Sequence, residues 1–81
     1  MKGWEKTGWD VKPRFQNIYG KKGSKAVVWI DNWSKGRWGV VHGIEHPSKQ
    51  GSAKYEEKGT YVNVSSKSEA IKYLKEYMRT H

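Results

Sequence analysis

The residue types that carry most enzymatic chemistry are few in this chain, and their spacing assembles no catalytic site. His42 and His46 lie four residues apart, but in a region predicted as strand and loop, and no third ligand follows at a zinc-site spacing. Glu56 and Glu57 are adjacent carboxylates with lysines close by on both sides, a pattern typical of a solvated loop. The absence of cysteine removes thiol nucleophiles, disulfides and thiolate metal ligands.

Serine and glycine clusters have structural explanations. Ser66 and Glu69 fit the Ser-x-x-Glu capping box at the start of a helix, so the serines at 65, 66 and 68 need no role as nucleophiles. The sequence GKKGS at residues 20–24 lacks the full spacing and the following helix of a phosphate-binding loop. We therefore expect a protein without enzymatic activity, cofactor or metal.

A segment without acidic residues is the strongest chemical signal in the sequence. Residues 12–25, KPRFQNIYGKKGSK, contain five cations and two aromatic rings but no carboxylate. The chain of 81 residues carries 16 Lys and Arg against 8 Asp and Glu, a formal net charge of +8. Exposed Lys and Arg attract polyanions, because they displace the counterions that surround phosphate groups.

Aromatic content makes this signal more specific. Some of the five Trp, five Tyr and one Phe must fill the core, because aliphatic residues are few, and the surplus is available for stacking on bases. Exposed rings favour unpaired bases, since bases in a duplex have no free face. We therefore predict binding of single-stranded or locally unpaired DNA or RNA. The cations expected at phosphates are Lys12, Arg14, Lys21, Lys22, Lys25, Lys35 and Arg37. The rings expected at bases are Phe15, Tyr19, Trp29 and Trp33.

Other functions fit parts of the same pattern. A small interaction or inhibitor module that docks on an acidic protein would use the rings as anchors and the cations to steer association. Insertion of the sheet into a duplex groove also stays open. Sugar binding by exposed tryptophans accounts for the rings but leaves the net charge unexplained. The choice of DNA or RNA, any base preference and homodimer formation stay open.

The elements that must position these residues are predicted as a small sheet followed by a helix. Alternation and β-branched content predict strands, and glycine-containing segments predict the turns between them. The predicted strands cover residues 9–19 (interrupted at Pro13), 26–30, 37–44 and 60–64, with turns at 20–24 and 32–36 and a long polar loop at 45–59. After the capping box, the apolar residues Ala70, Ile71, Leu74, Tyr77 and Met78 recur at helical spacing.

This order of elements favours an α+β fold, an antiparallel sheet of three or four strands packed against one C-terminal helix. We expect residues 1–8 to form a flexible N-terminal arm with Trp4 as a possible anchor, and residues 9–81 to form a single domain. Because one helix covers one face of a sheet, the opposite face is expected to be open to solvent, covered by the N-terminal arm, or used for binding. The predicted ligand surface requires that it stay open. Alternation along residues 26–30 assigns Val28 and Ile30 to the helix side and Trp29 to the open side.

The third predicted strand has its own alternation. Trp38, Val40, His42 and Ile44 share one face, so we expect Trp38 in the core and His42 half-buried. The chain contains no apolar run long enough for a signal peptide or a membrane span. Together with the absence of cysteine, this favours a cytoplasmic or nucleoid-associated location.

Overall fold

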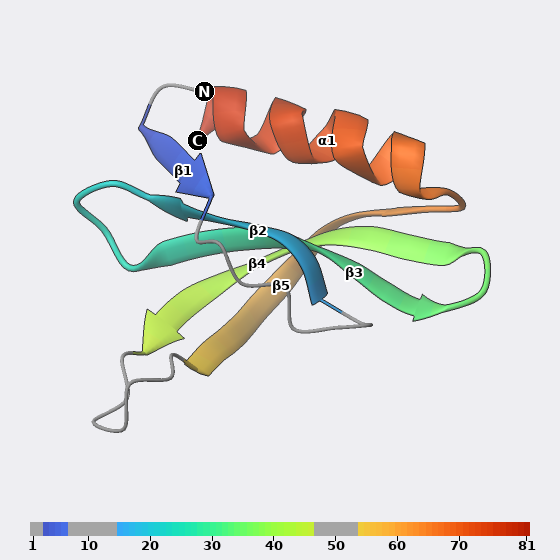
Figure 1. Ribbon diagram of the computed structural model, residues 1–81, viewed down its shortest axis with the longest axis horizontal. Coiled ribbons are helices and arrows are strands. Elements are labelled where there is room, and N and C mark those ends of the chain that lie inside the picture. The colour runs from blue at the N-terminus through green and yellow to red at the C-terminus, as the bar shows by residue number, and fades with distance from the viewer. Residues whose placement is uncertain (1–2, 7–14, 47–53) are drawn as a thin grey trace.

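A computed structural model of the chain, which describes residues 3–6, 15–46 and 54–81, shows one antiparallel sheet packed against one helix (Figure 1). The strands are β1 (Trp4–Lys6), β2 (Phe15–Lys21), β3 (Ala26–Ser34), β4 (Arg37–His46) and β5 (Lys54–Val64). Each strand pairs with the next, and helix α1 (Lys67–Thr80) follows β5. The predicted α+β architecture is confirmed, with five strands in place of three or four. No helix in the described ranges is long and apolar enough to cross a membrane.

The additional strand lies where a flexible arm was predicted. Trp4–Lys6 forms β1, which pairs antiparallel with β2. The side chain of Trp4 is only 7% exposed and packs in the core beneath α1. Burial of a large aromatic ring is strongly favourable, so Trp4 anchors these residues to the sheet. The prediction of a flexible arm is therefore corrected for residues 4–6.

Strand β5 is longer than predicted. Residues 54–59 were assigned to a polar loop, but they form the first half of β5, because β4 continues to His46 and pairs with them. Their polar side chains suit an edge strand, whose outer side faces water. The ladder between β4 and β5 shifts register twice, between Val40 and Val41 and between His42 and Gly43. Such bulges increase the local twist of a sheet.

The start of α1 forms the Ser66 half of the predicted capping box, while the Glu69 carboxylate contacts hydroxyl groups. Ser66 has an extended backbone, and its hydroxyl accepts a hydrogen bond from the backbone N–H of Glu69 at 3.3 Å. The carboxylate of Glu69 accepts hydrogen bonds from the hydroxyls of Ser65 and Ser66 at 3.0 and 3.1 Å. The bond to Ser66 satisfies the backbone N–H of Glu69, which has no partner within the helix.

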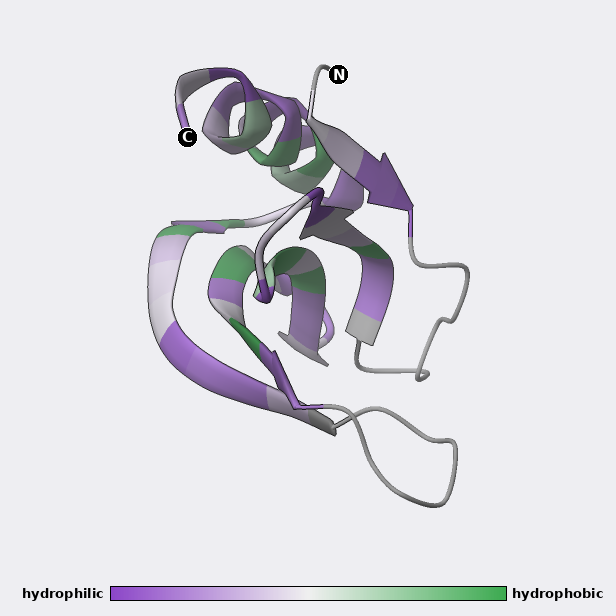
Figure 2. Ribbon diagram, turned by 90° about the vertical axis from the view of Figure 1, so that its left-hand side faces the viewer, coloured by the Kyte–Doolittle hydropathy of each residue, from purple (hydrophilic) through white to green (hydrophobic). Residues whose placement is uncertain are grey.

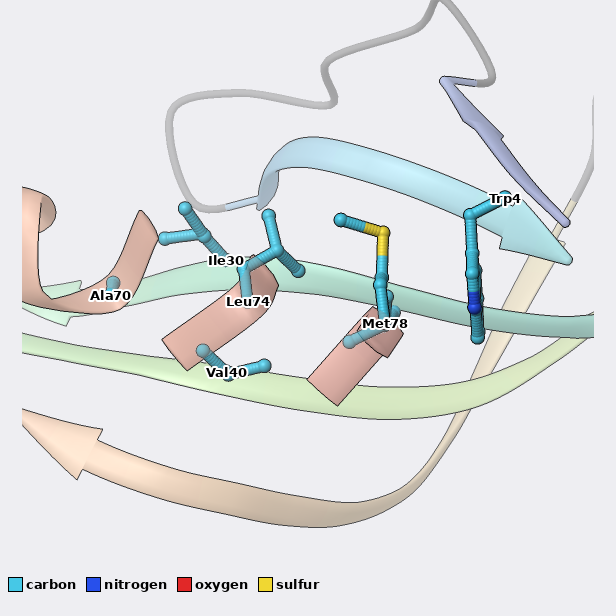
Figure 3. Close-up of a cluster of buried hydrophobic side chains, with 7 residues drawn as sticks. Trp4, Ile30, Val40, Ala70, Leu74 and Met78 are labelled. Atoms are coloured by element: carbon cyan, nitrogen blue, oxygen red, sulfur yellow. The ribbon is translucent and has the colours of Figure 1, made fainter. Parts of the chain in front are cut away.

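The first core lies between α1 and the sheet (Figure 3). Its buried members are Trp4, Val28, Ile30, Val40, Ala70, Leu74 and Met78. The helical stripe and the helix-facing parity of Val28 and Ile30 are thus confirmed. Trp38 is half-buried and packs against this core, as expected.

A second core occupies the opposite face of the sheet. Ile18, Val27, Trp29 and Val41 are each at most 2% exposed, and the half-buried rings of Trp33 and Tyr55 pack against them. The strands curl strongly in the end view of Figure 2, and register shifts in three of the strand pairs contribute to that curl. The expectation that this face stays open is therefore wrong, since it holds a core of its own.

Two glycines of β4 make room for the tryptophans of the second core. A Cβ atom added at Gly39 would lie 2.6 Å from the ring of Trp33. One added at Gly43 would lie 3.1 Å from the ring of Trp29 and would collide with the main chain of Glu56. Without a Cβ atom, β4 lets both rings approach its backbone closely.

Candidate nucleic-acid interface

The described cations of the predicted surface lie at two turns on opposite ends of β3 (Figure 1). Lys22 and Lys25 are exposed in the turn between β2 and β3, and Lys35 and Arg37 are exposed at the turn between β3 and β4. With nine residues in β3 and a rise of about 3.3 Å per residue, the strand is about 26 Å long, and its curl brings the two turns no further apart than that. The predicted cations therefore form two separate groups rather than one patch.

Two of the predicted cations, Lys12 and Arg14, lie outside the described residues, and so does the side chain of Phe15.

The other predicted rings are buried to different degrees. Tyr19 is half-buried against the first core, beneath α1. Trp29 is 2% exposed, and its ring lies 6.1 Å from that of Tyr55 in the second core. The prediction that Trp29 offers a stacking surface is therefore wrong, because the curled sheet and Tyr55 occupy the space around its ring.

The turn between β3 and β4 presents one ring beside two cations. The side-chain amide of Asn32 donates hydrogen bonds to the main-chain oxygens of Ser34 and Arg37, at 2.8 and 3.1 Å, and so holds the turn in shape. Trp33 is half-buried, with part of its ring over Gly39. The residue is thus only partly accessible, and it lies close in sequence to the exposed Lys35 and Arg37.

Lys21 has a structural contact that the sequence did not predict. Its ammonium group donates a hydrogen bond to the main-chain oxygen of His81 and lies 5.9 Å from the centre of the Trp4 ring. It joins the turn between β2 and β3 to the C-terminal end of α1, where backbone carbonyl groups carry partial negative charge. Its charge is thus partly engaged by the protein itself, whereas Lys22 and Lys25 are exposed.

Aromatic side chains from β1, β4, β5 and α1, together with His81 just after α1, lie close together near the C-terminal end of α1. Tyr77 stacks on His42 and on His81, with ring centroids 5.8 and 4.1 Å apart. Tyr61 and Trp4 meet Tyr77 edge to face, at 5.1 and 6.0 Å. We call Trp4, His42, Tyr61, Tyr77 and His81 the ring cluster.

Two members of the ring cluster reach the surface. Tyr61 is 36% exposed and is the one exposed large hydrophobic side chain in the described part of the chain. His81 is also exposed, whereas His42 is half-buried, as predicted. The members of the cluster are distant in sequence, so no local pattern indicates it, and the spacing around Tyr77 predicts only the apolar stripe of the helix.

The ring cluster also affects an ionisable group. Burial raises the pKa of the Tyr77 hydroxyl above its ordinary value, and the neighbouring hydroxyl of Tyr61 adds to this effect. Like any tyrosine with a pKa of about 10 or above, Tyr77 is uncharged at neutral pH. Its ring contacts the exposed rings of Tyr61 and His81. No group of three His, Asp or Glu side chains that could hold a metal ion occurs among the residues that the structure describes.

Most of the described cations have no acidic partner. Between described residues, Lys58 is the only Lys or Arg that forms an ion pair, with Glu56 at 2.8 Å. His46 contacts the same carboxylate at 2.7 Å. Side-chain hydrogen bonds with Lys58 and His46 lower the pKa of the Glu56 carboxyl, and the bond with Lys58 has the larger effect. The cations at the two turns and on α1 are therefore available to an external anion. Those exposed on α1 are Lys67, Lys72, Lys75 and Arg79.

Comparisons with known proteins add no functional information. No family model matches the chain, and neither the curated proteins nor the solved structures contain a match. The proposals below therefore depend on the residues and geometry of this chain.

Proposed function

We propose that this chain is a small non-enzymatic nucleic-acid-binding protein that prefers single-stranded or locally unpaired DNA or RNA. The main support is the set of exposed cations that have no carboxylate partner within the described ranges. Phosphate groups are the anions that such a set attracts most effectively, because each contact releases condensed counterions. This role fits the cytoplasm or the nucleoid, where nucleic acid is abundant.

The distance between the two turns suits an extended ligand. A single-stranded nucleic acid that crosses the surface from one end of β3 to the other would pass Lys22 and Lys25 at one end and Lys35 and Arg37 at the other, at most about 26 Å away. At the stacked spacing of 3.4 Å per nucleotide, that distance corresponds to about eight nucleotides, and to fewer in a more extended strand. The half-buried Trp33 lies near the second pair of cations. The geometry therefore supports a ligand that contacts both ends of β3.

A salt titration tests the proposal. A labelled oligonucleotide of about 12 nucleotides is titrated with protein at several salt concentrations, and binding is followed by fluorescence anisotropy. If about five phosphates are neutralised on a single strand, the logarithm of the association constant should fall against the logarithm of salt with a slope near −3.5. Absent or salt-insensitive binding would contradict the proposal.

The same titration with protein variants identifies which cations contact the phosphate groups. The double variant Lys35→Ala/Arg37→Ala should make the slope shallower by about 1.4, because two phosphate contacts are lost. Lys58→Ala serves as the control, since the Lys58 ammonium is already paired with Glu56. A control that weakens binding as much as the double variant would argue for non-specific attraction to net charge.

Docking on an acidic protein is the competing outcome. The edge of β5 is a poor template for strand addition by such a partner, because its ladder with β4 is irregular at two places and Glu56, Glu57 and Lys58 lie along it. Capture of partners from the source cell, with and without nuclease, separates the two functions. An acidic protein that stays bound after nuclease treatment would favour the interaction module.

A further inference from the structure

We infer that the ring cluster is the base-stacking part of the nucleic-acid site, with Lys22 and Arg79 at the phosphates beside it. This inference depends on the proposed function and deepens it, because it assigns the unpaired bases to one end of the molecule. The occupant is a single strand of DNA or RNA.

The accessible rings of the cluster are held in place by the fold. Tyr61 of β5 and His81 beyond the end of α1 contact each other, with ring centroids 6.1 Å apart. Both contact Tyr77, which is itself packed against Trp4 and His42. A ring that is already fixed loses little conformational freedom when a base stacks on it, so less of the stacking free energy is lost to ordering.

The charges around the cluster complement a phosphate backbone. Lys22 follows Lys21, whose ammonium is hydrogen-bonded to His81, and Arg79 lies in the last turn of α1. Both side chains are exposed, and neither forms an ion pair with a described carboxylate. Among the described residues, the acidic side chains at this end include Glu5 on β1, Glu76 on α1 and Glu45 on β4, whose backbone N–H donates a hydrogen bond to the main-chain oxygen of Lys25. The cations Lys6, Lys21, Lys22, Lys25 and Arg79 at the same end outnumber these three.

The rings favour a single strand over other polyanions. An acidic peptide or a duplex would satisfy the cations, but a duplex keeps its bases stacked on one another and away from the protein rings. Trp33, at the other end of β3, is the alternative platform. Part of its ring already lies over Gly39, so it offers a base less free surface. Tyr61 and His81 therefore give the better platform.

Two substitutions at Tyr61 test the inference, because they separate the ring from the rest of the side chain. Tyr61→Phe keeps the ring and should bind a labelled oligothymidine of about 12 nucleotides like the unchanged protein. Tyr61→Leu removes the ring but keeps an apolar side chain, and should weaken single-strand binding roughly 5- to 100-fold. Binding to a duplex of the same length should be equal in both variants. Thermal melting followed by circular dichroism checks that both variants fold.

His81→Ala provides an independent variant if Tyr61→Leu does not fold, because His81 is exposed and lies beyond the last turn of α1. It should show the same selective loss for the single strand. Equal single-strand affinity for the Phe and Leu variants, or an equal loss for single strand and duplex, would overturn the inference. So would a selective loss in Trp33→Leu that is absent in the Tyr61 variant. If the unchanged protein shows no salt-dependent binding at all, the proposed function itself fails.

Discussion

At the scale of single residues, Tyr77 shows how the neighbours of a side chain set its ionisation. Its ring is covered by Trp4, His42 and His81, and the resulting desolvation is the largest cause of its raised pKa. A raised pKa means that the folded state holds the phenolic proton at pH values where the unfolded chain releases it. The associated stability is fully present below the ordinary tyrosine pKa of about 10, and it is lost as pH rises from there through the folded pKa.

Tyr77→Phe should therefore change the alkaline limb of the stability profile. The variant has no phenolic proton to lose, so its free energy of unfolding should fall less than that of the unchanged protein between about pH 10 and pH 11. Urea denaturation of both proteins at pH 9 and at pH 11 measures the difference. Parallel losses in the two proteins would show that Tyr77 does not contribute to this limb.

At the scale of elements, β4 holds the sheet and both cores together. Val40 contributes to the core beneath α1, while Val41 contributes to the second core. Gly39 and Gly43 lie on the side of the second core and accept the rings of Trp33 and Trp29. The strand has to pack on both faces, and its two glycines are the positions where a side chain would prevent that packing.

Gly39→Ala should destabilise the protein by about 1–3 kcal/mol, the range found when extra atoms are forced into a packed site. The physical reason is the 2.6 Å approach of the new Cβ atom to the Trp33 ring. Urea denaturation measures the loss, and tryptophan fluorescence should shift as Trp33 moves toward water. In a Trp33→Leu background, Gly39→Ala should lower the free energy of unfolding by less, because the two sites are in contact. Equal costs in both backgrounds would argue against this contact.

At the scale of the whole molecule, one sheet separates two cores, so neither core can be lost without disturbing the other. The helix supplies Ala70, Leu74 and Met78 to the first core. The second core contains Trp29. Tryptophan fluorescence reports on both sides of the sheet, because Trp4 and Trp38 lie at the first core and Trp29 and Trp33 at the second. Helical circular dichroism reports on α1 alone. Both signals should change at one urea concentration if the domain unfolds in a single step.

Leu74→Ala tests the helix side of this arrangement. Leu74 is 2% exposed, and truncation of such a side chain costs about 2–5 kcal/mol. Lys75→Ala, a neighbouring exposed position, should change stability by less than about 0.5 kcal/mol. Urea midpoints followed by both probes give the comparison. A small loss in Leu74→Ala would contradict the packing of α1 on the sheet.

Local patterns predicted the elements of this protein well. The capping box and the apolar stripe placed α1, and glycine-containing segments placed the turns on either side of β3. Parity along β3 correctly assigned Val28 and Trp29 to opposite faces. These features are determined by interactions between residues close in sequence, so a single sequence carries the information. The ends of β4 and β5 were missed, because a polar edge strand and a polar loop have the same composition.

By itself, the amino-acid sequence determined the charge of this protein, its helix, its turns and its α+β class. The tertiary structure alone decided which rings contact water. Curling of the sheet closed the face that holds Trp29, while pairing of five strands brought Tyr61 and His81 together from distant segments. The physical reason is that exposure depends on what packs above a side chain, and that covering group belongs to another part of the chain.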